Sequence, residues 1–380
     1  MKTRIARRSG VAAIAAVTLI GIAACSPPTK TTDSASPGSL KAATATSATD
    51  LGGMAALVDA AKKEGTLNVI ALPPDWANYG EIIKGFQAKY GLKVDSTQPD
   101  ASSADEITAA KNLKGQSKAP DVFDLGGTVA SANTTMFAPY KVATFNDIPA
   151  LLKDPTGLGV SDYGGYMSIG YDSGKVPAPK TVADLLKPAY KGKVALNGDP
   201  TKAGSAFSGV VMAALSQGGT ADNIKPGVDF FAALNKAGNF LPVDPTPATI
   251  ESGQTPVVFD WDYLNVAQGK KLTGKMKWVT IIPANAVVGG YYVQAISKDA
   301  PHPAAARLWQ EYLYSDEGQN LWLKGGARPV REKAMVATGT IDKAAYAALP
   351  KAVGTPVFLT KAQNDKANAY LTANWAKAIG

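Results

Sequence analysis

The stretch Pro256-Val257-Val258-Phe259-Asp260-Trp261-Asp262-Tyr263 decides how the rest of the chain is interpreted. Three apolar residues of high strand propensity run directly into two carboxylates, a tryptophan and a tyrosine, which is typical of a buried strand whose end opens into a cleft. Two acids separated by one residue need water, a metal or an organic cation, and the indole between them offers the electron-rich face that an ammonium prefers. The pattern also fits a strand that ends in solvated acids. We treat Asp260, Trp261, Asp262 and Tyr263 as candidate ligand-binding residues.

The N-terminus has the pattern of a secretory signal. Basic residues at positions 2, 4, 7 and 8 precede an uncharged apolar run, which at about 14 residues is too short to span a bilayer stably. The run ends at Ile22-Ala23-Ala24-Cys25, which resembles the lipobox of bacterial lipoproteins. Cys25 is the only cysteine, so an internal disulfide is excluded. We predict a signal peptide over 1–24, lipidation of Cys25, and an extracytoplasmic protein anchored to the cell membrane.

The charge balance gives little support to nucleic-acid binding. The chain has 39 basic and 31 acidic residues, and 39 − 4 = 35 basic residues remain once the four in the signal are removed. This small excess is not gathered into a basic stripe interleaved with aromatic residues. We therefore expect no nucleic-acid partner.

Composition divides the remaining chain into a tether and a globular part. Residues 26–50 are rich in Ser, Thr, Ala and Lys and contain Pro27-Pro28, so we predict that residues 25–50 are a lipidated N-terminus and a flexible tether. The roughly 330 residues from Leu51 onward exceed what one hydrophobic core usually serves, and two lobes are expected. No period typical of repeat proteins recurs, which argues against a solenoid.

The first part of the globular region alternates strands with helices. Strands are predicted at 66–71, 92–97 and 120–125, each preceded by a helical segment. This order predicts an α/β fold with parallel strand pairs and right-handed crossovers. Ligands of open α/β sheets lie beyond the carboxyl ends of the strands. Asp75, Trp76 and Gly127, in the loops after the first and third strands, are therefore candidate ligand-binding residues. Trp76 also fits a lid over the sheet, and the Gly126-Gly127 pair also fits a simple turn.

Two crossings between the lobes are predicted. The strand at 167–172 follows a segment of small residues that suits a hinge, and the segment 289–296 has the alternation and glycines of a returning strand. Between them, Thr201 and Ser205 open an alanine-rich helix whose start suits an anion or a carboxylate, although ordinary capping uses the same residues. We predict lobe 1 at 51–168 and 289–380, and lobe 2 at 169–288.

The sequence offers little material for catalysis. His302 is the only histidine and lies between two prolines, which leaves almost nothing for a histidine-based triad or a histidine-rich metal site. No phosphate-binding loop and no dinucleotide fingerprint follows a predicted strand. General acid–base work by carboxylates stays open, but we expect a protein without enzymatic activity and without a cofactor.

Two further motifs carry a family resemblance. Glu64-Gly65-Thr66-Leu67-Asn68-Val69 and Tyr314-Ser315-Asp316-Glu317-Gly318-Gln319 resemble extracellular solute-binding proteins of ABC importers. The resemblance covers nearly all the chain after the tether and is greatest to the branch of ferric-ion, polyamine and aminophosphonate binders. It implies the type 2 periplasmic-binding-protein fold, in which two α/β lobes joined by two crossover strands close on a ligand about a hinge. It also implies a monomer that passes a small solute to a membrane permease.

The choice of solute rests on tyrosines, acids and indoles. Ferric-ion binders that resemble this chain use adjacent tyrosines. Tyr291-Tyr292 is such a pair, but it lies in the crossover, where successive side chains point to opposite faces. Where those binders place tyrosines, this chain has Asp260-Trp261-Asp262-Tyr263, with both acids on one face if the strand continues. We expect a polyamine or related amine such as putrescine or spermidine. Ferric ion held through Tyr291 and Tyr292, or an aminophosphonate, are the alternatives.

Overall fold

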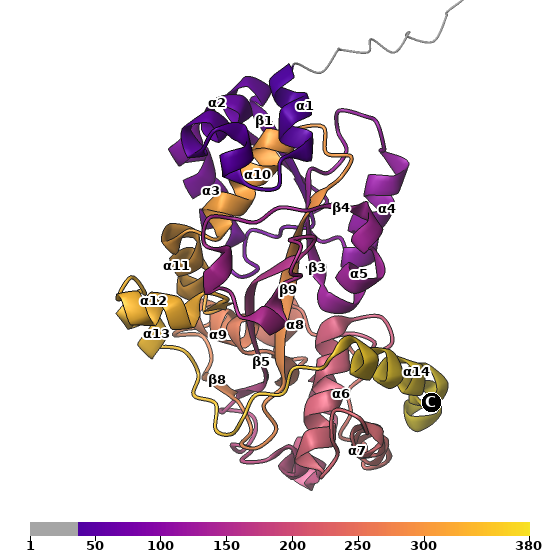
Figure 1. The fold of residues 1–380 in the computed structure, drawn as a ribbon. Helices are drawn as coiled ribbons and strands as arrows, with labels where there is room; N and C mark the ends of the chain where they lie inside the picture. The colour runs from indigo at the N-terminus through magenta and orange to yellow at the C-terminus, as the bar shows by residue number, and fades with distance from the viewer. Residues whose placement is uncertain (1–36) are drawn as a thin grey trace, which may run out of the picture. The chain divides into compact units, whose positions relative to one another are not determined.

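The computed structural model describes residues 37–380, which fold into two α/β lobes (Figure 1). The predicted signal peptide over 1–24 and the predicted lipidation site Cys25 lie outside these residues. The strands, in chain order, are β1 (Thr66–Ile70), β2 (Lys93–Thr97), β3 (Val122–Gly126), β4 (Phe137–Ala138), β5 (Val160–Asp172), β6 (Val194–Leu196), β7 (Val257–Trp261), β8 (Trp278–Ile281), β9 (Gly289–Ser297) and β10 (Arg328–Pro329).

Lobe 1 is built on β1, β2, β3, β9 and the first half of β5. β1 and β2 are parallel, as predicted. β3 lies beside β1, where the Asp121 N–H donates to the Asn68 carbonyl (3.0 Å), and pairs antiparallel with β9. The helices of this lobe are α1 (Pro37–Thr44), α2 (Met54–Glu64), α3 (Tyr79–Tyr90), α4 (Ser103–Asn112), α5 (Gly127–Ala132), α10 (Pro303–Leu313), α11 (Asp316–Lys324), α12 (Glu332–Thr338) and α13 (Lys343–Ala347), with 3-10 helices η1 (Ala48–Leu51), η2 (Thr134–Met136), η3 (Phe145–Asp147) and η4 (Ala150–Leu152).

Lobe 2 is built on the second half of β5 with β6, β7 and β8. β5 pairs antiparallel with β7 on one side and with β8 on the other, and β6 runs parallel to β7. The helices of this lobe are α6 (Gly204–Ser216), α7 (Lys225–Lys236), α8 (Pro247–Glu251), α9 (Asp262–Lys271) and α14 (Lys361–Ile379), with 3-10 helices η5 (Val182–Leu186) and η6 (Pro188–Tyr190).

The predicted crossover strand is present but longer than expected. β5 runs for 13 residues, so that Val160–Tyr166 pairs with β9 in lobe 1 and Met167–Asp172 pairs with β7 and β8 in lobe 2. Beside this crossing, Gly290 of β9 lies against the Trp261 ring, and Gly165 of β5 lies against the Tyr263 ring. A Cβ at either glycine would collide with the ring, so glycine is needed for the end of β7 to approach both crossover strands.

Part of the predicted tether is folded, since residues 37–50 contain α1 and most of η1. α1 and η1 pack on α2 and α10 of lobe 1, with Ala42 and Ala45 fully or nearly fully buried. The buried guanidinium of Arg307 in α10 donates to the carbonyls of Ala43 (2.9 Å) and Ala45 (2.8 Å). The low hydrophobicity of this segment suggested disorder, but a few alanines and backbone carbonyls are enough to dock it.

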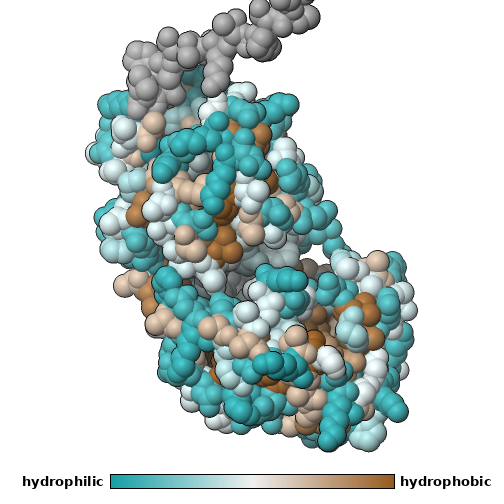
Figure 2. All heavy atoms as spheres, turned by 90° about the vertical axis from the view of Figure 1, so that its right-hand side faces the viewer, coloured by the Kyte–Doolittle hydropathy of each residue, from teal (hydrophilic) through white to brown (hydrophobic). Residues whose placement is uncertain are grey.

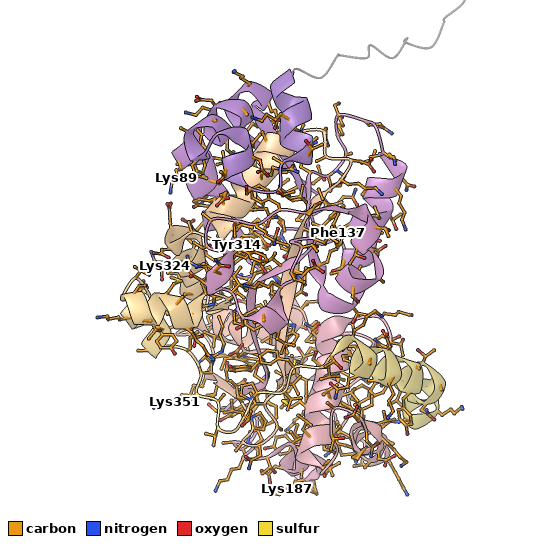
Figure 3. The ribbon with its side chains drawn as sticks, in the orientation of Figure 1. Lys89, Phe137, Lys187, Tyr314, Lys324 and Lys351 are labelled. Carbon is orange, nitrogen blue, oxygen red and sulfur yellow. The ribbon has the colours of Figure 1, made fainter. Side chains whose placement is uncertain are left out.

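The predicted boundary of the last segment also differs from the structure. Residues 289–350 belong to lobe 1, but the chain then crosses the hinge a third time. The Val357 N–H donates to Val287 O and the Gly289 N–H donates to Val357 O, both at 2.9 Å. The label Lys351 in Figure 3 shows where this segment runs beside lobe 2, the lower part of the view. α14 then packs on α7 of lobe 2, where the Trp375 ring lies 5.4 Å from Phe231.

No helix in residues 37–380 is both long and apolar enough to cross a membrane. The face of the molecule shown in Figure 2 is hollowed between its upper and lower parts, which correspond to the two lobes of Figure 1.

Candidate functional site

Five aromatic side chains from the two lobes meet beside the crossover strands; we call them the aromatic cluster. Trp76 follows β1, Tyr163 lies in β5 and Tyr292 lies in β9, whereas Trp261 ends β7 and Tyr263 lies in the first turn of α9. The centroid of the Trp76 ring is 6.0 Å from that of Tyr263 and 5.8 Å from that of Tyr292. The Tyr163 ring is parallel to Tyr292 at 5.5 Å and lies 6.0 Å from Tyr263. The Trp261 and Tyr263 rings stack at 6.4 Å.

The loop that carries Trp76 has a strained backbone. Ala71 (φ 59°), Ala77 (φ 44°) and Asn78 (φ 73°) all have left-handed conformations, which cost a residue with a Cβ roughly 1 kcal/mol or more each. The amide Nδ2 of Asn78 donates to Leu321 O of α11 (2.9 Å) and fixes the end of the loop. Backbone strain of this kind is concentrated at ligand sites. Here the strained loop places Trp76 beside Tyr292 of lobe 1 and Tyr263 of lobe 2.

Asp260 is the last residue but one of the buried strand β7 and lies next to the aromatic cluster. Its side chain accepts a hydrogen bond from the Trp261 N–H (2.8 Å) and is only 9% exposed. Burial raises its pKa to about 7, against the opposing effect of a hydrogen bond from Asn197. Within residues 41–380 no lysine, arginine or histidine forms an ion pair with Asp260. Asp260 is therefore a buried acid whose charge is not balanced by any cation of the described residues.

Asp262 has a different environment, because the strand does not continue to it as a shared face with Asp260 would require. The strand ends at Trp261 and α9 begins at Asp262, so the alternation of a strand no longer applies. Its Oδ1 accepts from the N–H groups of Tyr166 and Tyr263, both at 3.0 Å, and its Oδ2 lies 3.4 Å from Arg328. Burial, partly offset by Arg328, raises its pKa to about 6. Asp262 thus fixes the start of α9 and joins it to lobe 1.

Asp124 in β3 is an acid of the site that the sequence analysis did not select. The Trp76 indole donates to the Tyr163 hydroxyl (2.7 Å), and this hydroxyl donates to Asp124 Oδ2 (3.1 Å). Tyr79 and Gln294, inside lobe 1, also hydrogen-bond to this buried carboxylate. Burial raises the pKa of Asp124 to about 7. The only feature of the sequence that could have indicated Asp124 is its position as the second acid, after Asp121, in the otherwise apolar run 119–125.

Two further acids lie behind Asp124. Glu106 accepts a hydrogen bond from the Asp124 N–H (3.0 Å), and Asp162 accepts one from the Tyr163 N–H (2.7 Å). Both are almost completely buried, and burial followed by the charge of Asp124 raises the pKa of each. Lobe 1 therefore has an acidic interior directly beneath the aromatic cluster.

The remaining candidates do not join this cluster. Asp75 is exposed and forms an ion pair with Lys271 of α9 (2.8 Å). Gly127 is exposed at the start of α5. The Thr201 hydroxyl donates to Asp199 (2.7 Å), and the Ser205 hydroxyl donates to Asn197 O (3.1 Å), so both make local hydrogen bonds, and neither side chain caps α6.

The two adjacent tyrosines face opposite sides of β9, as strand alternation predicts. Tyr292 lies in the aromatic cluster, whereas the Tyr291 ring lies 5.9 Å from Phe358 in the third crossing segment. Among the described residues, no group of three or more histidine, cysteine or acidic side chains is placed to hold a metal ion. The neighbouring pair therefore does not form one two-tyrosine site.

Comparison with known proteins identifies what this arrangement is similar to. Residues 126–375 match the sequence model of a family described as bacterial extracellular solute-binding protein. Iron-bound HitA from Pseudomonas aeruginosa is 20% identical over 83% of this chain and 99% of its own, with a TM-score of 0.60.

Two other solved structures hold organic ligands. AfuA from Actinobacillus pleuropneumoniae, with fructose-6-phosphate bound, is 15% identical over 82% of this chain and 99% of its own, with a TM-score of 0.60. AgtB from A. tumefaciens R10, in complex with agropinic acid, is 15% identical over 83% of this chain and 98% of its own, with a TM-score of 0.62. At these identities the likeness shows the fold, and it confirms the predicted two-lobed periplasmic-binding architecture.

Proposed function

The chain belongs to the family of bacterial extracellular solute-binding proteins, and from this premise we propose that it captures a small organic amine of the putrescine and spermidine class between its lobes. As the solute-binding component of an ABC importer, it is extracytoplasmic and works with a membrane permease. A role in capture and delivery requires no chemical conversion of the solute, and we propose that the protein is a monomer without enzymatic activity.

One observation carries the amine proposal. Asp260 lies at the edge of an aromatic cluster formed by both lobes, is buried, and has no cationic partner among the described residues. A buried carboxylate without a partner is costly, and an ammonium group supplies both the missing charge and hydrogen-bond donors. The faces of Trp76, Trp261 and the tyrosines attract the same ammonium and pack on its alkyl chain.

Ferric ion is the second candidate, because three phenols and a carboxylate meet in the cluster. Tyr163, Tyr263 and Tyr292, with Asp124, offer the oxygen ligands that a hard cation prefers. Binding of iron as tyrosinate would require loss of the phenolic protons. Burial, reinforced by neighbouring acids, raises the pKa of all three phenols, which disfavours that loss and is the reason we rank the amine first.

Calorimetric titration of the purified protein with putrescine, spermidine, 2-aminoethylphosphonate and ferric ion plus carbonate tests the proposal. We expect an amine to bind, and Asp260→Asn to weaken it by about 30-fold to several thousand-fold, since removal of one partner of a desolvated charge pair costs about 2 to 5 kcal/mol. Asp75→Asn is the matched control, because Asp75 is an exposed acid of lobe 1 that lies outside the aromatic cluster. An iron-dependent tyrosinate absorption band, lost in Tyr292→Phe but kept in Tyr291→Phe, together with indifference to every amine, would establish the iron alternative.

We also propose that Cys25 carries the lipid that holds the protein at the cell membrane. The proposal rests on Ile22-Ala23-Ala24-Cys25 following an uncharged apolar run. Cell fractionation should find the protein with the membrane, and Cys25→Ala should release it because the acyl chains are its only proposed anchor. A Cys25→Ala variant that stays in the membrane fraction would contradict lipid anchoring.

A further inference from the structure

The end of lobe 1 that lies farthest from lobe 2 is formed by four segments, and we call it the distal end (Figure 1). It contains α1, the last turn of α2, the loop 113–121 before β3, and the loop 298–302 after β9. Glu64, the last residue of α2, accepts from the N–H groups of Ala304 (3.1 Å) and Ala305 (2.8 Å) at the start of α10. Segments far apart in the sequence thus share one surface.

The acids of the distal end are turned inward or paired. Asp121 is fully buried, accepts from the N–H of His302 (2.7 Å) and lies 2.9 Å from the ring nitrogen Nδ1 of the same residue. Asp299 forms an ion pair with Lys114 (3.2 Å). The carboxylate of Glu64 is directed at the start of α10. These acids therefore contribute little negative charge to the outer surface.

The lysines of the distal end are exposed instead. Five of them have no ion-pair partner among the described residues, and we call these five the lysine face: Lys41 in α1, Lys62 and Lys63 in α2, Lys111 in α4, and Lys118 in the loop before β3. Asp59, in the middle of α2, is an exposed acid close to them in the sequence. The distal end therefore has an excess of positive charge at its surface.

The chain enters the folded protein at this same end. α1 begins at Pro37 and is held on α10 by Arg307, whose buried guanidinium donates to Ala43 O and Ala45 O. The proposed lipidation site, Cys25, precedes Pro37 by 37 − 25 = 12 residues. Twelve residues span at most about 40 Å even when fully extended. With a lipid on Cys25, the distal end is therefore the part of the protein that is kept near the membrane.

We propose that the lysine face is a membrane-contact surface that binds the anionic headgroups of the bilayer to which the protein is anchored. Its position relative to the membrane rests on the proposed lipidation of Cys25, whereas its charge rests on the folded chain alone. Each lysine near an anionic bilayer adds a modest attraction that decays within a Debye length, about 8 Å at physiological salt. Several lysines and a short tether, which raises their local concentration, act together.

The composition of the distal end favours a lipid surface over another protein as its partner. Specific protein interfaces have an apolar core and are depleted in lysine. The exposed large apolar side chains of the described residues all lie outside the four segments of the distal end: Met54, Leu151, Val279, Val336, Tyr346 and Val353. A layer of anionic headgroups requires only positive charge on the protein, which is what this end supplies.

Contact through the distal end leaves the rest of the molecule free to move. Lobe 2 and the crossover strands lie on the other side of lobe 1 from this end (Figure 1). The lobes can therefore open and close while lobe 1 stays on the headgroups. At physiological salt the contact is too weak to hold the protein without acyl chains, which agrees with the release expected of Cys25→Ala.

Vesicle binding by the unacylated protein tests the surface without the anchor. The Cys25→Ala protein is sedimented with vesicles of phosphatidylcholine, either pure or with roughly one-third phosphatidylglycerol, at about 20 mM salt. We expect at least about tenfold tighter binding to the anionic vesicles, and loss of this binding at about 0.5 M salt, because salt screens exposed charges. Equal binding to both kinds of vesicle would overturn the inference.

A triple charge reversal locates the surface on the distal end. Lys62→Glu, Lys63→Glu and Lys118→Glu are combined in the Cys25→Ala protein. We expect the combination to weaken binding to anionic vesicles at least about tenfold, because three attractive charges become repulsive. Thermal unfolding establishes that the variant is folded. Binding that stays at the level of the parent protein would contradict a role of the lysine face.

A matched reversal in lobe 2 is the control. Lys180→Glu, Lys191→Glu and Lys236→Glu change the net charge by the same amount, at lysines that are also exposed and have no ion-pair partner among the described residues. We expect this variant to weaken binding by less than about threefold, because its charges lie beyond a Debye length of the bilayer. Equal losses in the two triple variants would show attraction by net charge alone and would refute a specific surface.

A fluorescent label reports which end of the molecule touches the bilayer. Because Cys25 is the only cysteine, the Cys25→Ala protein can take one new thiol at an exposed position. We place it at Ser117→Cys in the distal end, or at Ala189→Cys in lobe 2, close to Lys187 at the bottom of Figure 3. A polarity-sensitive dye should shift to the blue on anionic vesicles at position 117 only. An equal shift at position 189 would rule out the proposed orientation.

The outcomes separate this inference from the proposed lipid anchor. If Cys25 holds the protein at the membrane but the unacylated protein ignores anionic vesicles, the membrane-contact surface is wrong and the anchor stands. If Cys25→Ala changes nothing in cell fractionation while its vesicle binding depends on the lysine face, the anchor is wrong and the surface stands.

Discussion

Asp260 and Asp262 are two positions apart, yet their surroundings assign them opposite roles. Asp262 accepts from two backbone N–H groups and pairs with Arg328, whose buried Nε has no hydrogen-bond partner among the described residues. Asp260 accepts from one backbone N–H and has no ion-pair partner among the described residues. Asp262 is thus balanced by a cation of the protein, whereas Asp260 is the acid that we propose binds the solute.

This difference predicts opposite effects of the same substitution. Asp262→Asn should lower the free energy of unfolding by about 3 kcal/mol, because it leaves Arg328 buried and unpaired, and should change amine affinity only a few-fold. Asp260→Asn should leave stability unchanged or raise it, because it removes an unbalanced buried charge, and should weaken amine binding. Urea denaturation and calorimetry measure both effects. Loss of affinity in Asp262→Asn at unchanged stability would contradict the assignment.

At the scale of elements, α9 and α14 decide how the lobes are joined. α9 of lobe 2 contacts lobe 1 along its length: Asp262 pairs with Arg328 at its start, while Lys271 pairs with Asp75 near its end. α14 follows the third crossing segment and packs on lobe 2. Its Trp375 is buried between Phe231 and Phe240 of that lobe. The hinge is thus spanned by three chain segments, one more than the sequence analysis expected.

Trp375 tests whether α14 is an integral part of lobe 2. Trp375→Ala should lower the free energy of unfolding by about 3 to 5 kcal/mol, the usual cost of truncating a buried tryptophan. Thr372→Ala, on the exposed side of the same helix, should cost less than about 1 kcal/mol. Both are measured by urea denaturation. A cost below about 1 kcal/mol for Trp375→Ala would show that α14 is not part of the cooperative core.

At the scale of the whole molecule, the stability of the ligand-free protein depends on its buried acids. Burial raises the pKa of Asp124 and Asp260 to about 7, and that of Asp262 to about 6. Burial also raises the pKa of Glu106 and Asp162. The folded protein therefore binds more protons than the unfolded chain between about pH 4 and pH 7, so its stability falls as pH rises through this range.

We expect this fall to be visible and attributable to particular acids. A carboxyl whose pKa rises from its ordinary value near 4 to about 7 costs at most about 4 kcal/mol above pH 7. Unfolding by urea at pH 5 and pH 7.5 should show lower stability at pH 7.5, and the double variant Asp124→Asn with Asp260→Asn should show a smaller difference. Saturating putrescine should also reduce the difference. A wild type that is more stable at pH 7.5 than at pH 5 would contradict the prediction.

The sequence by itself determined the elements and their class, because strand alternation, helix caps and glycine breaks act over a few residues. It predicted β1, β2, β3 and the returning strand β9 to within about two residues, and the separation of Tyr291 from Tyr292 follows from strand alternation alone. It also selected Trp76, Asp260 and Tyr263, which lie at strand ends where ligands of α/β sheets bind.

Only the tertiary structure decided which of these residues meet and which are already satisfied. Asp124 lies within an apolar run of the sequence, and its hydrogen bond from Tyr163 joins residues 39 positions apart in the chain. Asp262 is the first residue of α9 and is not part of the strand. Arg328 of lobe 1 forms an ion pair with it. A hydrogen bond or ion pair between distant segments leaves no local pattern, so the site depends on how the two lobes bring those segments together.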